Sequence, residues 1–427
     1  MNVLIIGSGG REHAIAYKVK ESKLLNELFI LPGNAGTSTI GINIEVDAAD
    51  HKQIGEFCSE KNIDLVVIGP EQPLVEGLAD YLRGKGIKVF GPNKNAAEIE
   101  ANKSFAKRIM KKAGVPTGSF VGFPAKMHEA VKEYLQNKKY PCVIKANGLA
   151  AGKGVFICQT FDEAEKILED LFDKKIFGEA GDYVLVEEYL EGEEASVFAI
   201  SDGKDFVCLP ASQDHKRIGE NDTGKNTGGM GAYAPTPLIT PKLMEEVKNR
   251  IIAPTLRTLK DEGREFIGCL YAGIIITKDG TKVIEFNCRF GDPETQVVLP
   301  ILKGDLLELL YSAASGNLNR DAVEYNEGCA VCVVAASKGY PDTYEKGFTI
   351  EGLEKTWEDV KVFHAGTKLD NNKVVTNGGR VLGITAFHKN NDLPTAKSKA
   401  YSALKEINFR NMYYRTDIAD KALKGEN

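Results

Sequence analysis

The sequence predicts a multidomain α/β protein with an N-terminal doubly wound parallel sheet, central α+β domains and a β-rich C-terminal domain. Over the first 90 residues, short apolar runs alternate with amphipathic stretches, as parallel strands alternate with the helices that connect them. Hairpin-like pairs of strands replace this alternation further along the chain. The length of 427 residues also exceeds what a single hydrophobic core usually serves.

The N-terminal elements follow a regular order. Strands are predicted at residues 2–7, 27–31, 64–69 and 87–90, and helices between them at 11–22, 50–61 and 73–84. A Lys-rich amphipathic helix near 95–113 comes next, and Gly114-Val115-Pro116 marks its end. We place an N-terminal domain at residues 1–101.

Mixed hairpins and helices follow in a second domain, expected at residues 102–323, with a mobile flap subdomain at about 120–190. Its clearest hairpin runs from Ile274 to Glu285, where Asp279-Gly280 fits a type I′ turn. A third domain at 324–427 contains β-rich segments at 329–336 and 380–387 and a helix near 394–406.

Composition argues against several classes of protein. The formal net charge is −6, so the chain lacks the basic excess that binding to nucleic acid or anionic membranes requires. No apolar run approaches bilayer thickness and no basic leader is visible, so we expect a cytoplasmic protein acting on small molecules, as a monomer or weak homo-oligomer. The eight cysteines fit reduced core thiols, and a buried strand is favoured over a metal or redox role for Cys329 and Cys332.

A glycine turn between the first strand and the first helix predicts a phosphate site. In the stretch Gly7 to His13, glycines let backbone amides approach an anion, and the helix N-terminus adds a partial positive charge. A dinucleotide is disfavoured, because Glu12 replaces the third glycine of G-x-G-x-x-G and no acid closes the second strand. Arg11 favours a phosphate monoester, although such a turn can also bind nothing.

A second glycine-rich loop lies between two strands, at Gly148 to Gly154. It is not a Walker loop, because only three residues separate its first two glycines and no Ser or Thr follows the lysine. Such a loop can fold over a triphosphate while Lys145, on the preceding strand, offsets phosphate charge. The alternative is an ordinary hairpin with an idle lysine, which is disfavoured because a lysine is costly to bury without an anion.

A third signal is the pair Glu285 and Asn287. Residues two apart on a strand point to one face, so this carboxylate and this amide oxygen can share a hard cation, such as magnesium, with nucleotide phosphates. Arg289 continues the same face and can hold a carboxylate bidentately. A half-solvated strand without a metal remains the alternative.

The order of these features resembles the ATP-grasp superfamily: a lysine-bearing helix, the Lys145 strand with its glycine flap, the acidic stretch Val184 to Glu194, and the Glu-x-Asn strand. Further motifs resemble the phosphoribosylamine–glycine ligase family. They are Gly7 to His13, Gly69 to Glu71, Gly148 to Val155, Gln213 to Arg217, Asn226 to Tyr233, Arg289 to Gln296, His364 to Thr367 and Gly378 to Leu382.

This resemblance implies an ATP-dependent ligase of de novo purine biosynthesis. Such an enzyme joins glycine to 5-phosphoribosylamine through glycyl phosphate, giving glycinamide ribonucleotide, ADP and phosphate. The resemblance assigns ATP phosphates to Lys103, Lys145 and the flap residues Gly152, Lys153 and Gly154, adenine to Glu187 and Leu190, ribose to Glu194, and Mg²⁺ or Mn²⁺ to Glu285 and Asn287. It assigns phosphoribosylamine to Gly9, Gly10, Arg11, Glu12 and Glu71, and glycine to Asp214 and Arg289. Lys145, Arg289 and Asp214 are the expected catalytic residues.

Two positions depart from the family pattern. Lys225 stands where relatives commonly have proline, and Gly273 stands where many ATP-grasp enzymes have another metal carboxylate. A nicotinamide oxidoreductase, a nucleotide-binding module without catalysis and a sister ligase using another carboxylate remain as alternatives. We expect His215 to be structural or substrate-orienting.

Overall fold

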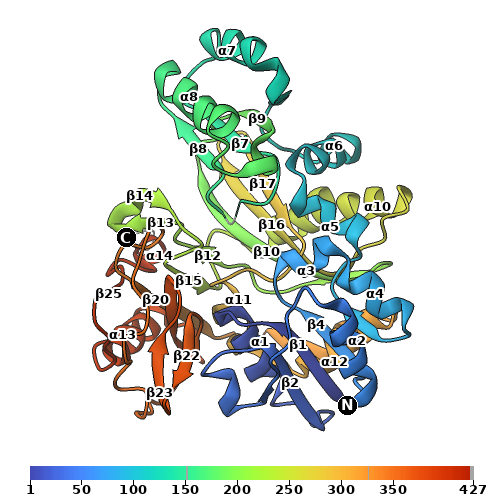
Figure 1. Ribbon diagram of the computed structural model, residues 1–427, viewed down its shortest axis with the longest axis vertical. Coiled ribbons are helices and arrows are strands. Elements are labelled where there is room, and N and C mark those ends of the chain that lie inside the picture. Colours follow the sequence, from blue (N-terminus) through green and yellow to red (C-terminus); the bar gives the residue numbers. More distant parts are fainter. Residues whose placement is uncertain (151, 326, 424–427) are drawn as a thin grey trace.

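The computed structural model describes residues 1–150, 152–325 and 327–423. A flap of strands and helices projects at the top of Figure 1, and the N-terminal and C-terminal sheets lie side by side below a central antiparallel sheet. This arrangement confirms the predicted fold class. In the described part of the chain, no helix is long and apolar enough to cross a membrane.

The N-terminal sheet is parallel throughout, with strand order β3-β2-β1-β4-β5. Its strands are β1 (Asn2–Gly7), β2 (Glu27–Pro32), β3 (Ile42–Asn43), β4 (Leu65–Ile68) and β5 (Lys88–Phe90). The connecting helices are α1 (Gly10–Val19), α2 (His51–Glu60), α3 (Glu71–Glu76) and α4 (Leu78–Gly84). β1 and β4 are buried on both faces, which explains their continuous apolar runs.

Two helices that the sequence predicts as continuous are each broken in two. Gly77, with φ of +92°, separates α3 from α4. The predicted helix at 95–113 forms α5 (Lys94–Ala101) and α6 (Lys103–Ala113), because Asn102 is extended and its side chain caps α6 by accepting from the Phe105 N–H. The second break places Lys103 at a helix N-terminus.

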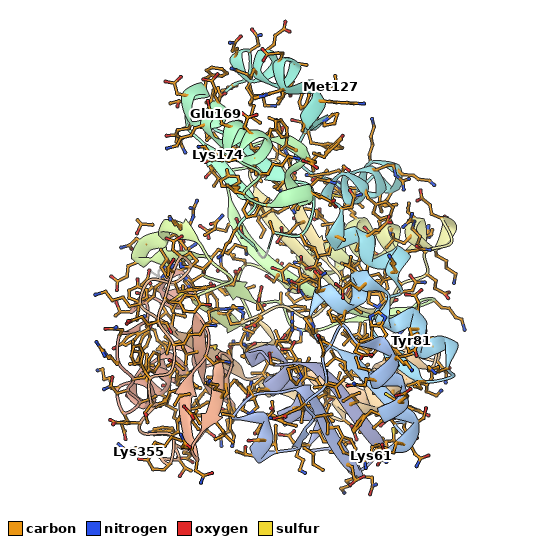
Figure 2. All side chains as sticks on the ribbon, in the orientation of Figure 1. Lys61, Tyr81, Met127, Glu169, Lys174 and Lys355 are labelled. Atoms are coloured by element: carbon orange, nitrogen blue, oxygen red, sulfur yellow. The ribbon has the colours of Figure 1, made fainter. Side chains whose placement is uncertain are left out.

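The flap contains an antiparallel sheet of order β6-β9-β7-β8, and Met127, Glu169 and Lys174 mark its outer part in Figure 2. The strands are β6 (Phe120–Pro124), β7 (Cys142–Ala146), β8 (Val155–Cys158) and β9 (Tyr183–Glu188), covered by α7 (His128–Gln136) and α8 (Phe161–Leu168). Buried residues of these strands and helices form a separate hydrophobic core.

The central sheet has the order β11-β10-β16-β17 and carries the predicted metal strand at its edge. Its strands are β10 (Glu193–Asp202), β11 (Phe206–Cys208), β16 (Ile267–Thr277) and β17 (Gly280–Asn287), flanked by α9 (Pro241–Val247) and α10 (Ala253–Asp261). The expected type I′ turn is wrong: that turn needs positive φ at both central residues, Lys278 and Asp279, and only Gly280 has it (φ +107°). A bulge at Ile284 also shifts the register between β16 and β17.

The C-terminal sheet combines two distant stretches of sequence, in the order β12-β15-β20-β24-β21 with β25 beside β20. Its strands are β12 (Gln213–Asp214), β15 (Gly231–Ala234), β20 (Cys329–Ser337), β21 (Val360–His364), β24 (Arg380–His388) and β25 (Met412–Tyr413). Two separate two-stranded sheets accompany it, β13 (Arg217–Gly219) with β14 (Thr223–Asn226) and β22 (Thr367–Asp370) with β23 (Lys373–Thr376). The helices of this region are α13 (Leu393–Leu404) and α14 (Asp420–Leu423). Cys329 and Cys332 are free thiols buried in β20, which confirms the buried-strand interpretation.

A linking segment connects the central and C-terminal sheets through α11 (Thr295–Val298), β18 (Leu302–Gly304), α12 (Leu306–Ala314) and β19 (Val323–Tyr325). Leu306, Leu307 and Leu310 of α12 share one hydrophobic core with Val3 and Ile5 of β1. The chain therefore returns to complete the core of the N-terminal sheet. The domain boundaries at 101 and 323 stay predictions.

Candidate active site

Two lysines predicted to hold ATP phosphates lie where the flap sheet meets the central sheet. Lys103, the first residue of α6, donates from Nζ to the Gly148 carbonyl at 3.0 Å. Lys145, on β7, places its Nζ 3.2 Å from Glu187 Oε2 and 3.2 Å from the Ile284 carbonyl oxygen. The structure thus brings the two lysines together, one from each side of the glycine loop.

Lys107 joins this cluster and was not predicted from the sequence. Its Nζ lies 2.8 Å from Glu187 Oε2 and 2.8 Å from Thr117 Oγ1. Its position could have indicated this role, because Lys107 follows Lys103 by four residues on an amphipathic helix, where such side chains share a face. Burial raises the pKa of Glu187, but the charges of Lys145 and Lys107 outweigh it and leave that pKa lowered.

The glycine loop connects β7 to β8 beside these lysines. The Ala146 N–H donates to the Gly154 carbonyl at 2.8 Å, which closes the base of the loop. Gly152 has φ of +74°, a conformation that favours glycine, and the Lys153 side chain is exposed. A Cβ on Gly154 would lie 2.7 Å from the Ala150 Cβ, so a larger residue would displace the loop.

Glu285 and Asn287 lie two apart on β17, as predicted. Neither side chain makes a hydrogen bond or ion pair with any other residue that the structure describes. Over the same residues, no group of three or more His, Cys, Asp or Glu side chains is arranged to hold a metal. One carboxylate and one amide oxygen fit a hard cation that takes its other ligands from phosphate and water.

The residues predicted to meet adenine and ribose lie on the flap strand β9, on β10 and between the two strands. In the described part of the chain, neither the N–H nor the C=O of Leu190 makes a hydrogen bond, so both are available to a ligand. Glu194, on β10, lies with Oε2 3.2 Å from Lys216 Nζ. Glu187 is engaged by lysines through Oε2, while its buried Oε1 has no hydrogen-bond partner in the described structure.

Asp214, predicted to bind the glycine amine, belongs to an acidic cluster. Its Oδ1 lies 2.6 Å from Lys216 Nζ, and the nearby Glu294 is buried. Burial lowers the pKa of Lys216, but Asp214 and further carboxylates raise it well above its ordinary value. Burial and the charge of Asp214 raise the pKa of Glu294. With Glu194, two carboxylates contact one ammonium group, an excess of negative charge that suits a further cation.

Arg289 links the central sheet to the N-terminal domain. Its Nε lies 3.3 Å from Glu71 Oε2, and its Nη2 lies 3.1 Å from Glu100 Oε1. Glu100 also accepts the Cys288 N–H at 2.7 Å, and no sequence pattern had singled it out, because 188 residues separate the two. Burial lowers the pKa of Arg289, but Glu100 and Glu71 raise it above its ordinary value.

The N-terminal turn is built around the buried side chain of Glu12. Glu12 Oε2 accepts the Gly9 N–H at 2.6 Å, and Oε1 accepts from Arg11 Nε at 2.5 Å. A Cβ on Gly7 would lie 2.5 Å from Glu12 Cδ, and one on Gly69 would lie 2.1 Å from Oε1, so a side chain at either position would displace the Glu12 carboxylate. Arg11 also donates from Nη1 to the Phe290 carbonyl at 3.1 Å, so two of its guanidinium nitrogens are already engaged by the protein.

A cavity of about 450 Å³ opens beside this turn. Its charged lining consists of Arg11, Glu12, Asp47, Glu76 and Asp292. Acids predominate, so this lining suits hydroxyl and amine donors, while the first-turn N–H groups of α1, at Gly10 and Arg11, remain for an anion.

Asp292, which the sequence reasoning did not select, is fixed by Arg380 of β24, whose Nη2 lies 3.1 Å from its Oδ2, and by Gln296 at 2.8 Å.

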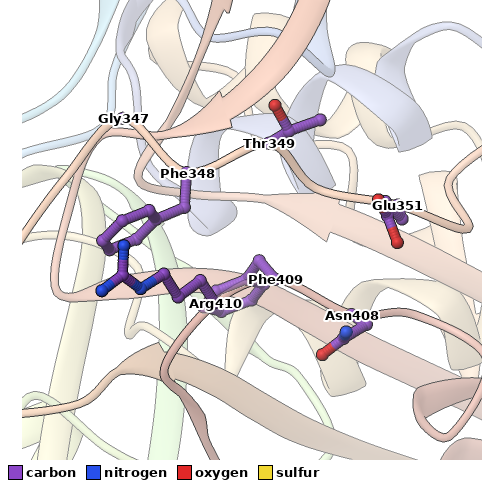
Figure 3. Close-up of a pocket in the computed structure, with 7 residues that line it drawn as sticks. All are labelled: Gly347, Phe348, Thr349, Glu351, Asn408, Phe409 and Arg410. Carbon is purple, nitrogen blue, oxygen red and sulfur yellow. The ribbon is translucent and has the colours of Figure 1, made fainter.

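A second cavity of about 460 Å³ lies in the C-terminal region, between the segments Gly347–Thr349 and Asn408–Arg410 (Figure 3). The Arg410 guanidinium lies 5.2 Å from the centre of the Phe348 ring. None of the predicted site residues lines this cavity, so it is separate from the candidate active site.

Two antiparallel sheets that enclose buried lysines and a Glu-x-Asn strand define the ATP-grasp class of enzymes. The fold agrees: the biotin carboxylase domain of Hydrogenobacter thermophilus 2-oxoglutarate carboxylase superposes with a TM-score of 0.72 at 20% identity, over 97% of this chain and 91% of that one. Phosphoribosylglycinamide synthetase models match three ranges, the N domain at 1–100, the ATP-grasp domain at 101–295 and the C domain at 330–421.

Full-length relatives give the same result. The phosphoribosylamine–glycine ligase of Agrobacterium fabrum is 47% identical over 100% of both chains. The crystal structure of the Thermotoga maritima phosphoribosylamine–glycine ligase superposes with a TM-score of 0.83 at 34% identity, over 98% of this chain and 100% of that one. The chain therefore belongs to the phosphoribosylglycinamide synthetase family of ATP-grasp ligases.

Proposed function

We propose that this chain joins glycine to 5-phosphoribosylamine with consumption of ATP, giving glycinamide ribonucleotide, ADP and phosphate. The observation that carries the proposal is the cluster of Lys103, Lys145 and the glycine loop opposite the free oxygens of Glu285 and Asn287. This is a site for a polyphosphate with a divalent cation. Family membership supplies the identity of the other two substrates.

In the first step, a glycine carboxylate oxygen attacks the γ-phosphorus of ATP, forming glycyl phosphate and releasing ADP. Lys145 and the flap amides offset the charge that develops on the transferred phosphoryl group. Glu285 and Asn287 would hold Mg²⁺, or Mn²⁺, which supplies a counter-charge to the nucleotide phosphates. Asp214, in its acidic cluster, orients the glycine ammonium, and Arg289 orients the carboxylate.

In the second step, the amine of phosphoribosylamine attacks the acyl carbon, the carbon–oxygen bond to phosphate breaks, and the amine loses a proton. The turn at Gly9 to Glu12, with Glu71, holds phosphoribosylamine beside Arg289, which contacts Glu71 directly. We further place the enzyme in the cytoplasm, as a monomer or weak homo-oligomer; its eight free cysteines suit a reducing compartment.

The test is release of ADP by the purified chain with glycine and phosphoribosylamine, supplied together and separately. We expect release only when both are present. Release that needs neither substrate, or that prefers another carboxylic acid to glycine, would contradict the proposal.

A further inference from the structure

Two lysines contact the same oxygen of Glu187, but they are held with different strength. Lys107 Nζ has two short contacts, 2.8 Å to Glu187 Oε2 and 2.8 Å to Thr117 Oγ1. Lys145 Nζ has two longer ones, 3.2 Å to the same carboxylate oxygen and 3.2 Å to the Ile284 carbonyl. Shorter charge-assisted hydrogen bonds are the stronger ones, so Lys145 is the more easily released of the two.

Lys107 is also anchored on both sides of the cluster. Its side chain is almost fully buried and lies over the Phe120 ring, with Nζ 5.5 Å from the ring centre. Thr117, its second partner, donates to the Val283 carbonyl of β17 at 2.7 Å. Lys107 therefore connects the flap strand that carries Glu187 to the strand that carries the predicted metal ligands.

Glu187 needs a cation at all times, because a buried carboxylate without one is strongly unfavourable. In the proposed reaction Lys145 must turn toward the phosphates of ATP, and Glu187 then loses one of its two partners. We propose that Lys107 is a positioning residue that keeps Glu187 neutralised and in place, so that Lys145 is free to bind the nucleotide. The inference rests on the proposed function only in requiring that the nucleotide binds at this site.

The test is a double-mutant cycle on the full chain, with MgADP titrated by calorimetry. Lys107→Met should weaken ADP binding by about tenfold or more, because Lys145 is then the only lysine among the described residues that still contacts Glu187. In a Glu187→Gln background, Lys145 is no longer held by a negative charge, so adding Lys107→Met should change ADP affinity by less than about twofold. Lys111→Met is the matched control, since Lys111 lies one turn further along α6 and is exposed; it should bind ADP as the unmodified chain does.

Two results would overturn the inference. One is unchanged ADP affinity in folded Lys107→Met. The other is an equal loss with and without Glu187, which would mean that Lys107 contacts the nucleotide or merely supports the fold. If Lys107→Met alone does not fold, the ADP affinities of Glu187→Gln and of the double variant are compared instead. Both variants avoid a buried charge without its partner at positions 107 and 187. A lower affinity in the double variant would overturn the inference. The titration needs neither glycine nor phosphoribosylamine, so its outcome is independent of the substrate assignment.

Discussion

Glu285 and Asn287 lie on β17, and their side-chain oxygens accept no hydrogen bond from any residue that the structure describes. We expect Glu285→Ala to retain its fold and to lose turnover by at least about a hundredfold, because the amide of Asn287 supplies no charge. Steady-state kinetics over a range of magnesium concentrations measures this loss. Lys278→Ala, in the exposed turn of the same hairpin, serves as the control. Unchanged activity and unchanged magnesium dependence in Glu285→Ala would place the metal elsewhere.

Several site residues were predictable because local sequence patterns reveal them. The spacing of Glu285 and Asn287 places both on one face of a strand, and Lys145 ends a buried strand before a glycine loop. Glu100 and Lys107 were missed, since their roles depend on contacts that no local pattern records. The substrate-binding residues were selected through the resemblance to the family, and their roles stay predictions.

Arg415 ties the C-terminal segment to the loop that follows Asp214. Its side chain is 1% exposed and makes a bidentate pair with Asp417, at 2.7 Å for each bond, while Nη1 lies 2.9 Å from Asp222 Oδ1. Burial raises the pKa of Asp417, but hydrogen bonds, chiefly from Arg415, hold it at about 2.

Removing Arg415 should therefore destabilise the protein. We expect Arg415→Met to lower the free energy of unfolding by about 3–5 kcal/mol, because Asp417 and Asp222 lose a buried cation. Denaturant titration followed by circular dichroism measures this quantity. Arg410→Met, at an exposed position of the same segment, should change it by less than about 0.5 kcal/mol. Equal stabilities of the two variants would show that the cluster contributes little.

The elements themselves were largely predictable, and their ends were not. The strands at 2–7 and 329–336 form where their apolar runs predict. The helix expected at 95–113 is broken because the Lys103 and Ser104 N–H groups donate to Asn147, a residue of the flap loop. A helical period in the sequence cannot show that a distant loop offers a better acceptor.

Two histidines join the N-terminal and C-terminal regions of the whole molecule. The His364 N–H donates to His13 Nδ1 at 2.9 Å, and Asn34 donates to the His364 carbonyl at 2.8 Å. Burial lowers the pKa of His364 to about 4, and burial with the charge of His364 lowers the pKa of His13 to about 3. Both rings therefore stay neutral in the folded state at neutral pH.

Stability should fall as pH decreases through the ordinary pKa of histidine. The unfolded chain binds protons below a pH of about 6.5 while the folded protein does not, so unfolding is favoured from there down to about 4. Between pH 7 and pH 5, His364→Gln should lose about 2 kcal/mol less stability than the unmodified protein. Urea titrations at the two pH values test this. Thr367→Val removes the hydrogen-bond partner of His364 but keeps the histidine ring, so it should be less stable than the unmodified protein by a similar amount at both pH values. Equal pH dependence of the unmodified protein and His364→Gln would contradict the assignment.

At the scale of the molecule, the order of regions was predictable and their interlocking was not. Strand and helix periods indicate a parallel sheet followed by hairpins. The pairing of β15, near residue 232, with β20, near residue 332, joins segments about 100 residues apart. Hydrophobic patterning alone does not identify such partners, because it shows which residues are buried but not which strand they pair with.

The return of α12 to the N-terminal sheet has a consequence for cutting the chain. A fragment of residues 1–101 would lack Leu306, Leu307 and Leu310, which share one hydrophobic core with Val3 and Ile5 and belong to the helix that contacts β4 and β5. We expect such a fragment to self-associate, because association buries apolar surface that would otherwise be exposed to water. Fusing residues 302–316 to its end through a flexible linker should restore a monomer, as size-exclusion chromatography would show. A monomeric 1–101 fragment would mean that the sheet folds without this distant helix.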